Sequence, residues 1–142
     1  MNKQISTKWF KQALHDLEMS GKNIPIGGYD VASFLAHQSV EKLMKSIFAL
    51  KGKKIPKTHY IDDLAKQLNL DEDIIDEILD LTVDYTFARY PDVGEHIPYE
   101  EYDEEIAQDK FERAKKIFGS VIEKYKDLKE LGNIKETEEI EP

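Results

Sequence analysis

The chain has 142 residues, with 20 Lys and Arg against 29 Asp and Glu, a formal net charge of -9 and 40% hydrophobic residues. This length and composition predict one soluble globular domain with a real core and exclude a disordered chain. The absence of cysteine excludes disulfides and thiolate metal sites and favours the reducing cytoplasm, and no apolar run approaches the roughly 18 residues of a membrane span.

Two long helices are predicted in the first third of the chain. Ser6 or Thr7 can cap the first helix, whose apolar side chains recur at helical spacing until it ends near Gly21. The second helix runs from Asp30 to about Lys51, and its apolar residues cover most of its circumference. We therefore expect the second helix to lie at the centre of the fold.

One polar stripe remains on this second helix. It consists of Gln38, Glu41, Lys42 and Lys45, whose spacings of three and four place them on a shared face. Further along, the residues from 42 to 61 include no acid, and Lys51, Lys53, Lys54 and Lys57 all fall within them. Such a basic stretch can attract a phosphate chain, or it can simply keep a loop soluble.

Two shorter helices are predicted next. Thr58 can cap a third helix, from His59 to Leu68, and Asp71 can cap a fourth. The apolar residues of the fourth helix recur at helical spacing far enough to deliver Arg89 at its C-terminal edge.

After a loop at residues 90–102, a fifth helix is predicted from about Asp103 to Leu128, with apolar steps of four and three. No useful stretch alternates with the period of a strand, so the sequence predicts an all-α fold, an up-and-down bundle of four to five helices. We expect one domain at residues 1–131 and an acidic, disordered tail at 132–142. The apolar surface of the second and fifth helices exceeds what one small bundle needs and predicts a homodimer.

The arginines are the most informative charged residues. Only two occur beside eighteen lysines, and Arg89 stands at the predicted end of the fourth helix, with His96 seven positions later. A guanidinium offers a rigid fork suited to phosphate, and an imidazole can transfer protons near neutral pH. An arginine and a histidine brought together could bind and cleave a phosphodiester. In the alternative interpretation, Arg89 caps its helix and His96 is an exposed loop residue.

Four segments in order make the chain resemble the HEPN domain over about residues 7–128. They are Trp9…Ala13-Leu14-His15-Asp16-Leu17, then Tyr29-Asp30-Val31-Ala32-Ser33-Phe34…Gln38-Ser39-Val40-Glu41-Lys42-Leu43-Met44-Lys45, then Pro56-Lys57-Thr58-His59…Leu64, and Ala88-Arg89-Tyr90-Pro91-Asp92. The resemblance implies a dimerising helical bundle found in prokaryotes beside minimal nucleotidyltransferases, in toxin–antitoxin and related systems.

The resemblance also implies a site. Many HEPN proteins are metal-independent endoribonucleases whose two protomers place an Arg-x4-6-His motif in a shared cleft, and Arg89 and His96 have the upper limit of that spacing. In this chain Tyr90 follows the arginine, and Pro91 and Gly94 predict a loop before His96. The segment resembles an Arg-Tyr-Pro-Asp branch of the family, for which nucleotide binding is proposed. The residues expected to bind nucleotide or RNA are Arg89, Tyr90, Gln38, Glu41, Lys42 and Lys45.

The remaining histidines are weaker candidates. His59 is expected in the first turn of the third helix, and His15 and His37 are expected at the surface or half-buried. No clustered ligand spacing is present, so neither a metal nor a cofactor is expected. Two classes of function follow: nucleotide or RNA binding at a dimer cleft, with cleavage by Arg89 and His96, and a non-catalytic interaction subunit of a minimal nucleotidyltransferase.

Overall fold

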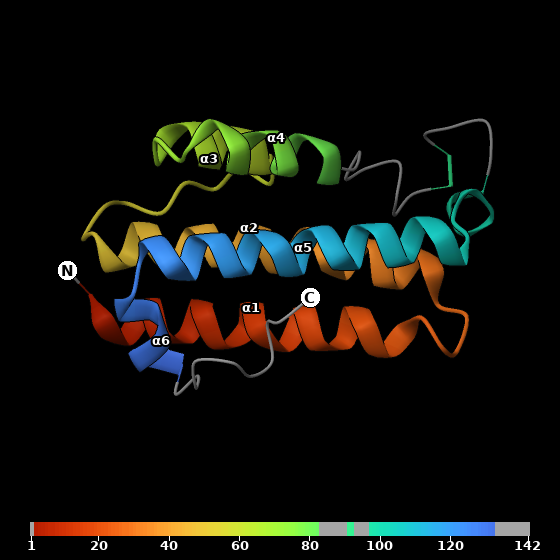
Figure 1. Ribbon diagram of the computed structural model, residues 1–142, viewed down its shortest axis with the longest axis horizontal. Helices are drawn as coiled ribbons and strands as arrows, with labels where there is room; N and C mark the ends of the chain where they lie inside the picture. Colours follow the sequence, from red (N-terminus) through yellow and green to blue (C-terminus); the bar gives the residue numbers. More distant parts are fainter. Residues whose placement is uncertain (1, 83–90, 93–96, 133–142) are drawn as a thin grey trace.

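The computed structural model describes residues 2–82, 91–92 and 97–132, and all regular structure in these segments is helical. The elements are α1 (Lys3–Asn23), α2 (Tyr29–Leu50), α3 (Ile61–Gln67), α4 (Glu72–Leu81), the 3₁₀ helix η1 (Pro98–Glu101), α5 (Glu104–Lys124) and α6 (Asp127–Gly132). Helices α1, α2, α4 and α5 alternate in direction along the long axis, with α3 beside α4 and α6 beside α1 (Figure 1). The predicted up-and-down bundle is confirmed.

Helix α2 lies at the centre and contacts α1, α3 and α5. From Val40 to Leu50 its apolar side chains are buried within this one chain, and Val40, Leu43, Met44 and Ile47 are fully buried. The surplus apolar surface that predicted a homodimer is therefore absent from this part of α2, because its neighbours in the same chain cover it. A dimer must be argued on other grounds.

The first helix starts earlier than predicted. Asn2 caps it, since its side-chain oxygen accepts a hydrogen bond from the Ile5 amide at 3.1 Å. Ser6 and Thr7 lie inside the helix, and the Ser6 hydroxyl donates to the carbonyl of Ser46 in α2 at 2.8 Å. Ser6 therefore joins two helices instead of starting one.

The third helix begins at Ile61, two residues later than predicted. The Thr58 hydroxyl accepts a hydrogen bond from the Tyr60 amide at 3.1 Å, so Thr58 stabilises the turn before the helix. His59 consequently lies in the segment that leads into α3 and not in its first turn. This position brings its side chain onto α2.

The fifth helix begins as predicted but ends early. The Asp103 carboxylate accepts from the Ile106 amide at 2.8 Å and caps α5. The helix ends at Lys124, and α6 follows from Asp127, with Leu128 fully buried in the same core. The apolar pattern runs through this break because both helices face the same core.

The fourth helix is described as far as Leu81, so the prediction that it delivers Arg89 falls outside the described residues. Most of the predicted tail, residues 133–142, also lies outside them. Among the described helices, none has the length and apolar character needed to cross a membrane.

Candidate functional site

Two charged residues of the α2 polar stripe are buried in the bundle. Glu41 and Lys45, one turn apart, have side chains only 4% and 6% exposed, and the Lys45 Nζ lies 3.0 Å from a Glu41 carboxylate oxygen. The Lys45 ammonium also lies 5.6 Å from the centre of the Trp9 ring on α1, within range of a cation–π contact. The charge of Lys45 is therefore compensated on two sides, although its side chain is almost fully buried.

The same carboxylate holds a histidine at the surface. The His59 Nδ1 lies 3.1 Å and 3.3 Å from the two carboxylate oxygens of Glu41, while the His59 side chain is 51% exposed. A carboxylate beside an ammonium can only accept a hydrogen bond, so Nδ1 carries the proton in this contact.

The other two residues of the stripe lie nearer to the surface. Lys42 is partly exposed and lies 2.5 Å from the carboxylate of Asp16 on α1, and the Gln12 amide donates to the same carboxylate at 2.9 Å. Gln38 is half-buried. The structure thus divides the predicted binding stripe into a buried ion pair under His59 and a partly buried ion pair between Lys42 of α2 and Asp16 of α1.

His37 lies one turn before Glu41 on α2, and the prediction for it is wrong, because it is only 2% exposed. Burial lowers the pKa of His37 to about 4, although the Glu41 carboxylate acts in the opposite direction. His37 is therefore neutral at pH 7. His15 on α1 is exposed at the surface, in agreement with its prediction.

Arg89, Tyr90 and His96 all fall outside the described residues, so their convergence stays a prediction. At the described end of α4, the Lys110 Nζ from α5 donates to the carbonyls of Asp80 and Leu81, at 3.1 Å and 3.4 Å. Lys110 thus places a cation at the described C-terminal end of α4. The capping interpretation of Arg89 stays a prediction.

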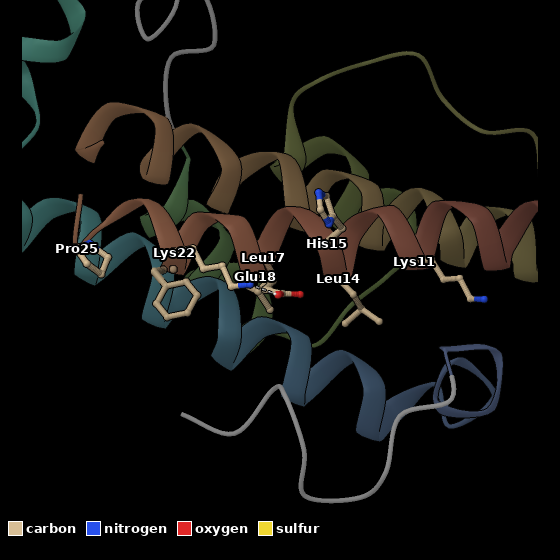
Figure 2. Close-up of a pocket in the computed structure, with 9 residues that line it drawn as sticks. Lys11, Leu14, His15, Leu17, Glu18, Lys22 and Pro25 are labelled. Atoms are coloured by element: carbon tan, nitrogen blue, oxygen red, sulfur yellow. Dashed lines mark ion pairs between the residues drawn. The ribbon is translucent and has the colours of Figure 1, made fainter. Parts of the chain in front are cut away.

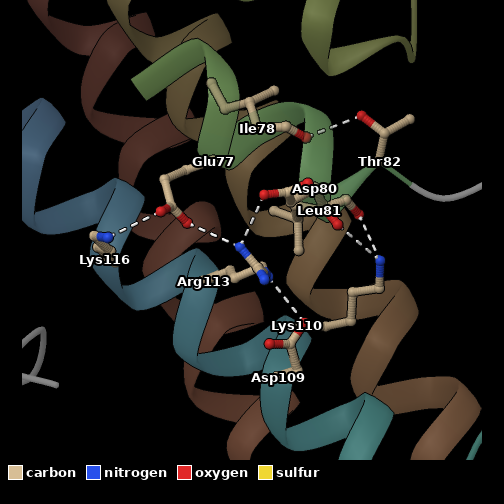
Figure 3. A network of polar contacts seen from close by, with 9 residues as sticks. All are labelled: Glu77, Ile78, Asp80, Leu81, Thr82, Asp109, Lys110, Arg113 and Lys116. Carbon is tan, nitrogen blue, oxygen red and sulfur yellow. Dashed lines mark hydrogen bonds and ion pairs between the residues drawn. The ribbon is translucent and has the colours of Figure 1, made fainter. Parts of the chain in front are cut away.

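The second arginine joins α4 to α5 (Figure 3). The Arg113 guanidinium contacts the carboxylates of Asp109 at 2.9 Å and of Glu77 and Asp80 at 3.2 Å, and Lys116 contacts Glu77 at 2.8 Å. These three partners of the guanidinium are acids of the protein itself. Arg113 is therefore a structural residue in this fold.

A groove of about 740 Å³ lies between α1 and α5, away from the polar stripe of α2 (Figure 2). Leu14, Leu17 and Phe111 form its apolar part. A side chain at Gly21 would place its Cβ 2.7 Å from the Phe111 ring, so glycine permits this close packing. Of the residues predicted to bind a ligand, none that the structure describes lines this groove.

The described residues include no group of three or more His, Asp or Glu side chains placed to hold a metal ion. Sequence reasoning missed the contact between His59 and Glu41, although both residues belong to the segments that carried the family resemblance. Two features of the sequence could have indicated this contact: a polar stripe on an otherwise apolar helix, and a histidine in the loop that follows that helix.

The fold and these segments define a class of small helical-bundle proteins. A sequence model of the HEPN domain matches residues 6–136, and the chain belongs to the HEPN domain family. The crystal structure of TT1696 from Thermus thermophilus is similar, with 28% identity and a TM-score of 0.77 over 87% of this chain and 99% of that chain. The crystal structure of ST0689, an archaeal HEPN homologue, has 32% identity and a TM-score of 0.68 over 95% of this chain and 99% of that chain. A comparison with curated proteins gave no match.

Proposed function

We propose that this HEPN-family protein binds a nucleotide or RNA, with His59 and Lys42 on one side of the ligand site and Arg89 and Tyr90 on the other. The observation that carries the proposal is the buried Glu41–Lys45 pair that holds an exposed imidazole. It unites two of the segments through which the chain resembles its family.

The argument rests on the energetics of buried charge. Removing an ion from water costs several kcal/mol even after relaxation, and an apolar pair of similar volume is often equally stable or more stable. Glu41 and Lys45 lie on a helix whose inward positions are mostly apolar. Folding alone does not require a carboxylate there, whereas fixing the orientation of His59 does.

The oriented imidazole suits a phosphate or ribose ligand. An imidazole can donate a hydrogen bond to a phosphate oxygen or accept one from a hydroxyl, so the ring that Glu41 orients is of a chemical type suited to such a ligand. Lys57 is exposed two residues earlier and adds positive charge. Attraction of a phosphate chain to this side follows from Coulomb's law and weakens with salt.

We further propose that cleavage, where it occurs, uses Arg89 and His96 of two protomers in a shared cleft, without a metal. One histidine accepts the 2′-hydroxyl proton as that oxygen attacks phosphorus, and the other protonates the departing 5′ oxygen. Arg89 stabilises the charge that develops on the phosphoryl oxygens. The products are a 2′,3′-cyclic phosphate and a 5′-hydroxyl end, consistent with a role in toxin–antitoxin or defence systems.

Binding is tested by fluorescence anisotropy with labelled single-stranded RNA and labelled mononucleotides in EDTA. His59→Gln removes the imidazole from the surface and should weaken binding by about 1 kcal/mol, which is roughly fivefold. Arg89→Lys keeps the charge but removes the fork and should weaken it by about 1–3 kcal/mol. The matched control is His15→Gln, which removes an exposed histidine from α1. If His59→Gln and His15→Gln bind the ligand with equal affinity, the α2 polar stripe and His59 do not form part of the binding site.

Cleavage and assembly are tested separately. RNA incubated with the protein in EDTA should acquire 2′,3′-cyclic phosphate ends, and His96→Ala should abolish them without changing the melting temperature. Sedimentation at micromolar concentration should give a dimer. A monomer of 16.5 kDa would contradict the shared-cleft mechanism but not nucleotide binding by one chain.

A further inference from the structure

One end of the bundle exposes apolar side chains to solvent. It comprises the connection between α1 and α2, the first turns of α2 and α5, and η1, at the right of Figure 1. The exposed fractions there are 78% for Ile26, 43% for Val31, 49% for Ile97, 62% for Tyr99 and 37% for Ile106. Only three other large hydrophobic side chains of the described residues are exposed, so this end holds most of them. We call these five residues the apolar end.

The elements of this end pack on one another, so the five side chains share a firm support. Ile24, Ala32 and Ala107 form a small buried cluster that joins the start of α2 to the start of α5. Helix η1 also contacts α2, and its Pro98 is buried. The exposed side chains are therefore displayed by a packed framework.

The surroundings of the apolar end are acidic. Neither residues 23–41 nor residues 90–109 contain a Lys or Arg. Exposed acids of the described residues occur throughout the second segment, namely Asp92, Glu100, Glu101, Asp103, Glu104, Glu105 and Asp109. Some have local roles, because Asp103 caps α5 and the next two acids favour its positive N-terminus. Helix capping does not account for the exposed isoleucines and Tyr99.

We propose that the apolar end docks a protein segment whose apolar anchor side chains are surrounded by Lys and Arg. Exposed apolar side chains with a charged rim are typical of protein–protein contacts, and a basic rim on the partner complements the acids here. A two-fold contact between copies through this end would place acid against acid.

Ile97 of the apolar end directly follows His96 in the chain, but this inference concerns the docking of a protein segment and does not rest on the proposed function. It is tested with the full chain and a defined probe, a labelled helical peptide of about 14 residues that has leucine on one face and lysine on the other. The double variant Ile26→Ser with Tyr99→Ser should weaken peptide binding about tenfold, because central apolar anchors dominate such contacts. Glu100→Gln with Glu104→Gln should weaken it about threefold at low salt.

Two matched controls exclude general attraction to an acidic protein. Ile5→Ser removes an exposed isoleucine from the first turn of α1, and Glu72→Gln with Asp73→Asn removes two exposed acids from α4. Both should retain wild-type affinity, and a peptide with glutamate in place of lysine should not bind. Equal losses in the controls and the test variants would overturn the proposal. So would a concentration-dependent assembly of the free protein that Ile26→Ser abolishes, which would identify a second copy as the occupant.

Discussion

Two clusters of charge in this bundle differ in almost every physical respect. The Glu41–Lys45 pair lies inside, with both side chains less than a tenth exposed. The Arg113 cluster lies on the outside of α4 and α5, where the arginine side chain is 30% exposed and that of Asp80 63%. The first cluster has few charged partners and little exposure to water. The second has many partners and much water.

The difference shows how little the number of ion pairs says about their importance. Exposed pairs gain little because water and salt screen them, and side-chain ordering offsets part of the gain. A buried pair is costly to form but still more costly to break, since removal of one partner leaves the other charge without compensation. Stability should therefore respond strongly to changes at Glu41 and weakly to changes at Arg113.

The largest effect is expected at Glu41. Glu41→Gln keeps the side-chain size but leaves the Lys45 ammonium buried without its carboxylate, so we expect the free energy of unfolding to fall by about 3–5 kcal/mol. Urea unfolding near neutral pH, followed by circular dichroism, measures this loss. A loss below about 1 kcal/mol, the usual value for an exposed pair, would show that the site is hydrated in solution.

A double variant separates stability from function. Glu41→Leu with Lys45→Met replaces both charges by apolar groups and should recover most of the stability lost in Glu41→Gln. Because His59 then has no carboxylate to orient it, RNA or nucleotide binding should remain weakened although the fold is restored. Recovery of both properties together would assign the pair a purely structural role.

The helical fold could be predicted from periodicity, but several boundaries could not. Three residues able to cap a helix, Asn2, Ser6 and Thr7, precede the first apolar run, and sequence alone does not say which one the chain uses. At the other end, apolar spacing continues through Tyr125 because α5 and α6 face one core. A break between two helices that keeps the same face toward the core does not change the spacing of the apolar residues.

The site was less predictable because it depends on the path of a loop. His59 and Glu41 are eighteen residues apart, and only the fold brings the segment before α3 back onto α2. The polar stripe was visible, but its burial was not, because a helix covered on most sides buries polar and apolar positions alike. His37 was misjudged for the same reason.

The next effect in size is pH-dependent and concerns His37. Its pKa is lowered in the folded state to about 4 from an ordinary value of 6.5. The unfolded chain therefore binds more protons than the folded chain between these values, so stability is complete above about pH 6.5 and is lost as pH falls toward 4. The loss attributable to this one group reaches about 3 kcal/mol.

Comparison with variants isolates this contribution from those of other groups. His37→Gln removes the titrating ring and should reduce the drop in unfolding free energy between about pH 7.5 and about pH 4.5, measured in urea. His15→Gln removes an exposed histidine and should leave most of that drop in place. Identical pH profiles for wild type and His37→Gln would mean that water reaches His37 in the folded state.

A smaller effect on stability is expected from the loss of one exposed hydrogen bond, the N-terminal cap of α5. Asp103→Ala removes the cap of α5 and should lower the unfolding free energy by about 1 kcal/mol, because the Ile106 amide loses its acceptor. Asp103→Asn keeps an acceptor oxygen and should be close to wild type. If both variants lose the same amount, the charge at the helix N-terminus matters more than the cap itself.

The smallest effect is expected at Arg113 in spite of its three acidic partners. Arg113→Ala should lower the unfolding free energy by about 1 kcal/mol or less at low salt, and the loss should shrink in about 1 M NaCl, where the screening length is about 3 Å. Glu41→Gln should lose a similar amount at both salt concentrations, because ions do not reach a buried pair. A salt-independent loss above about 2 kcal/mol at Arg113 would contradict the contrast between the two clusters and place the α4–α5 contact among the main stabilising elements.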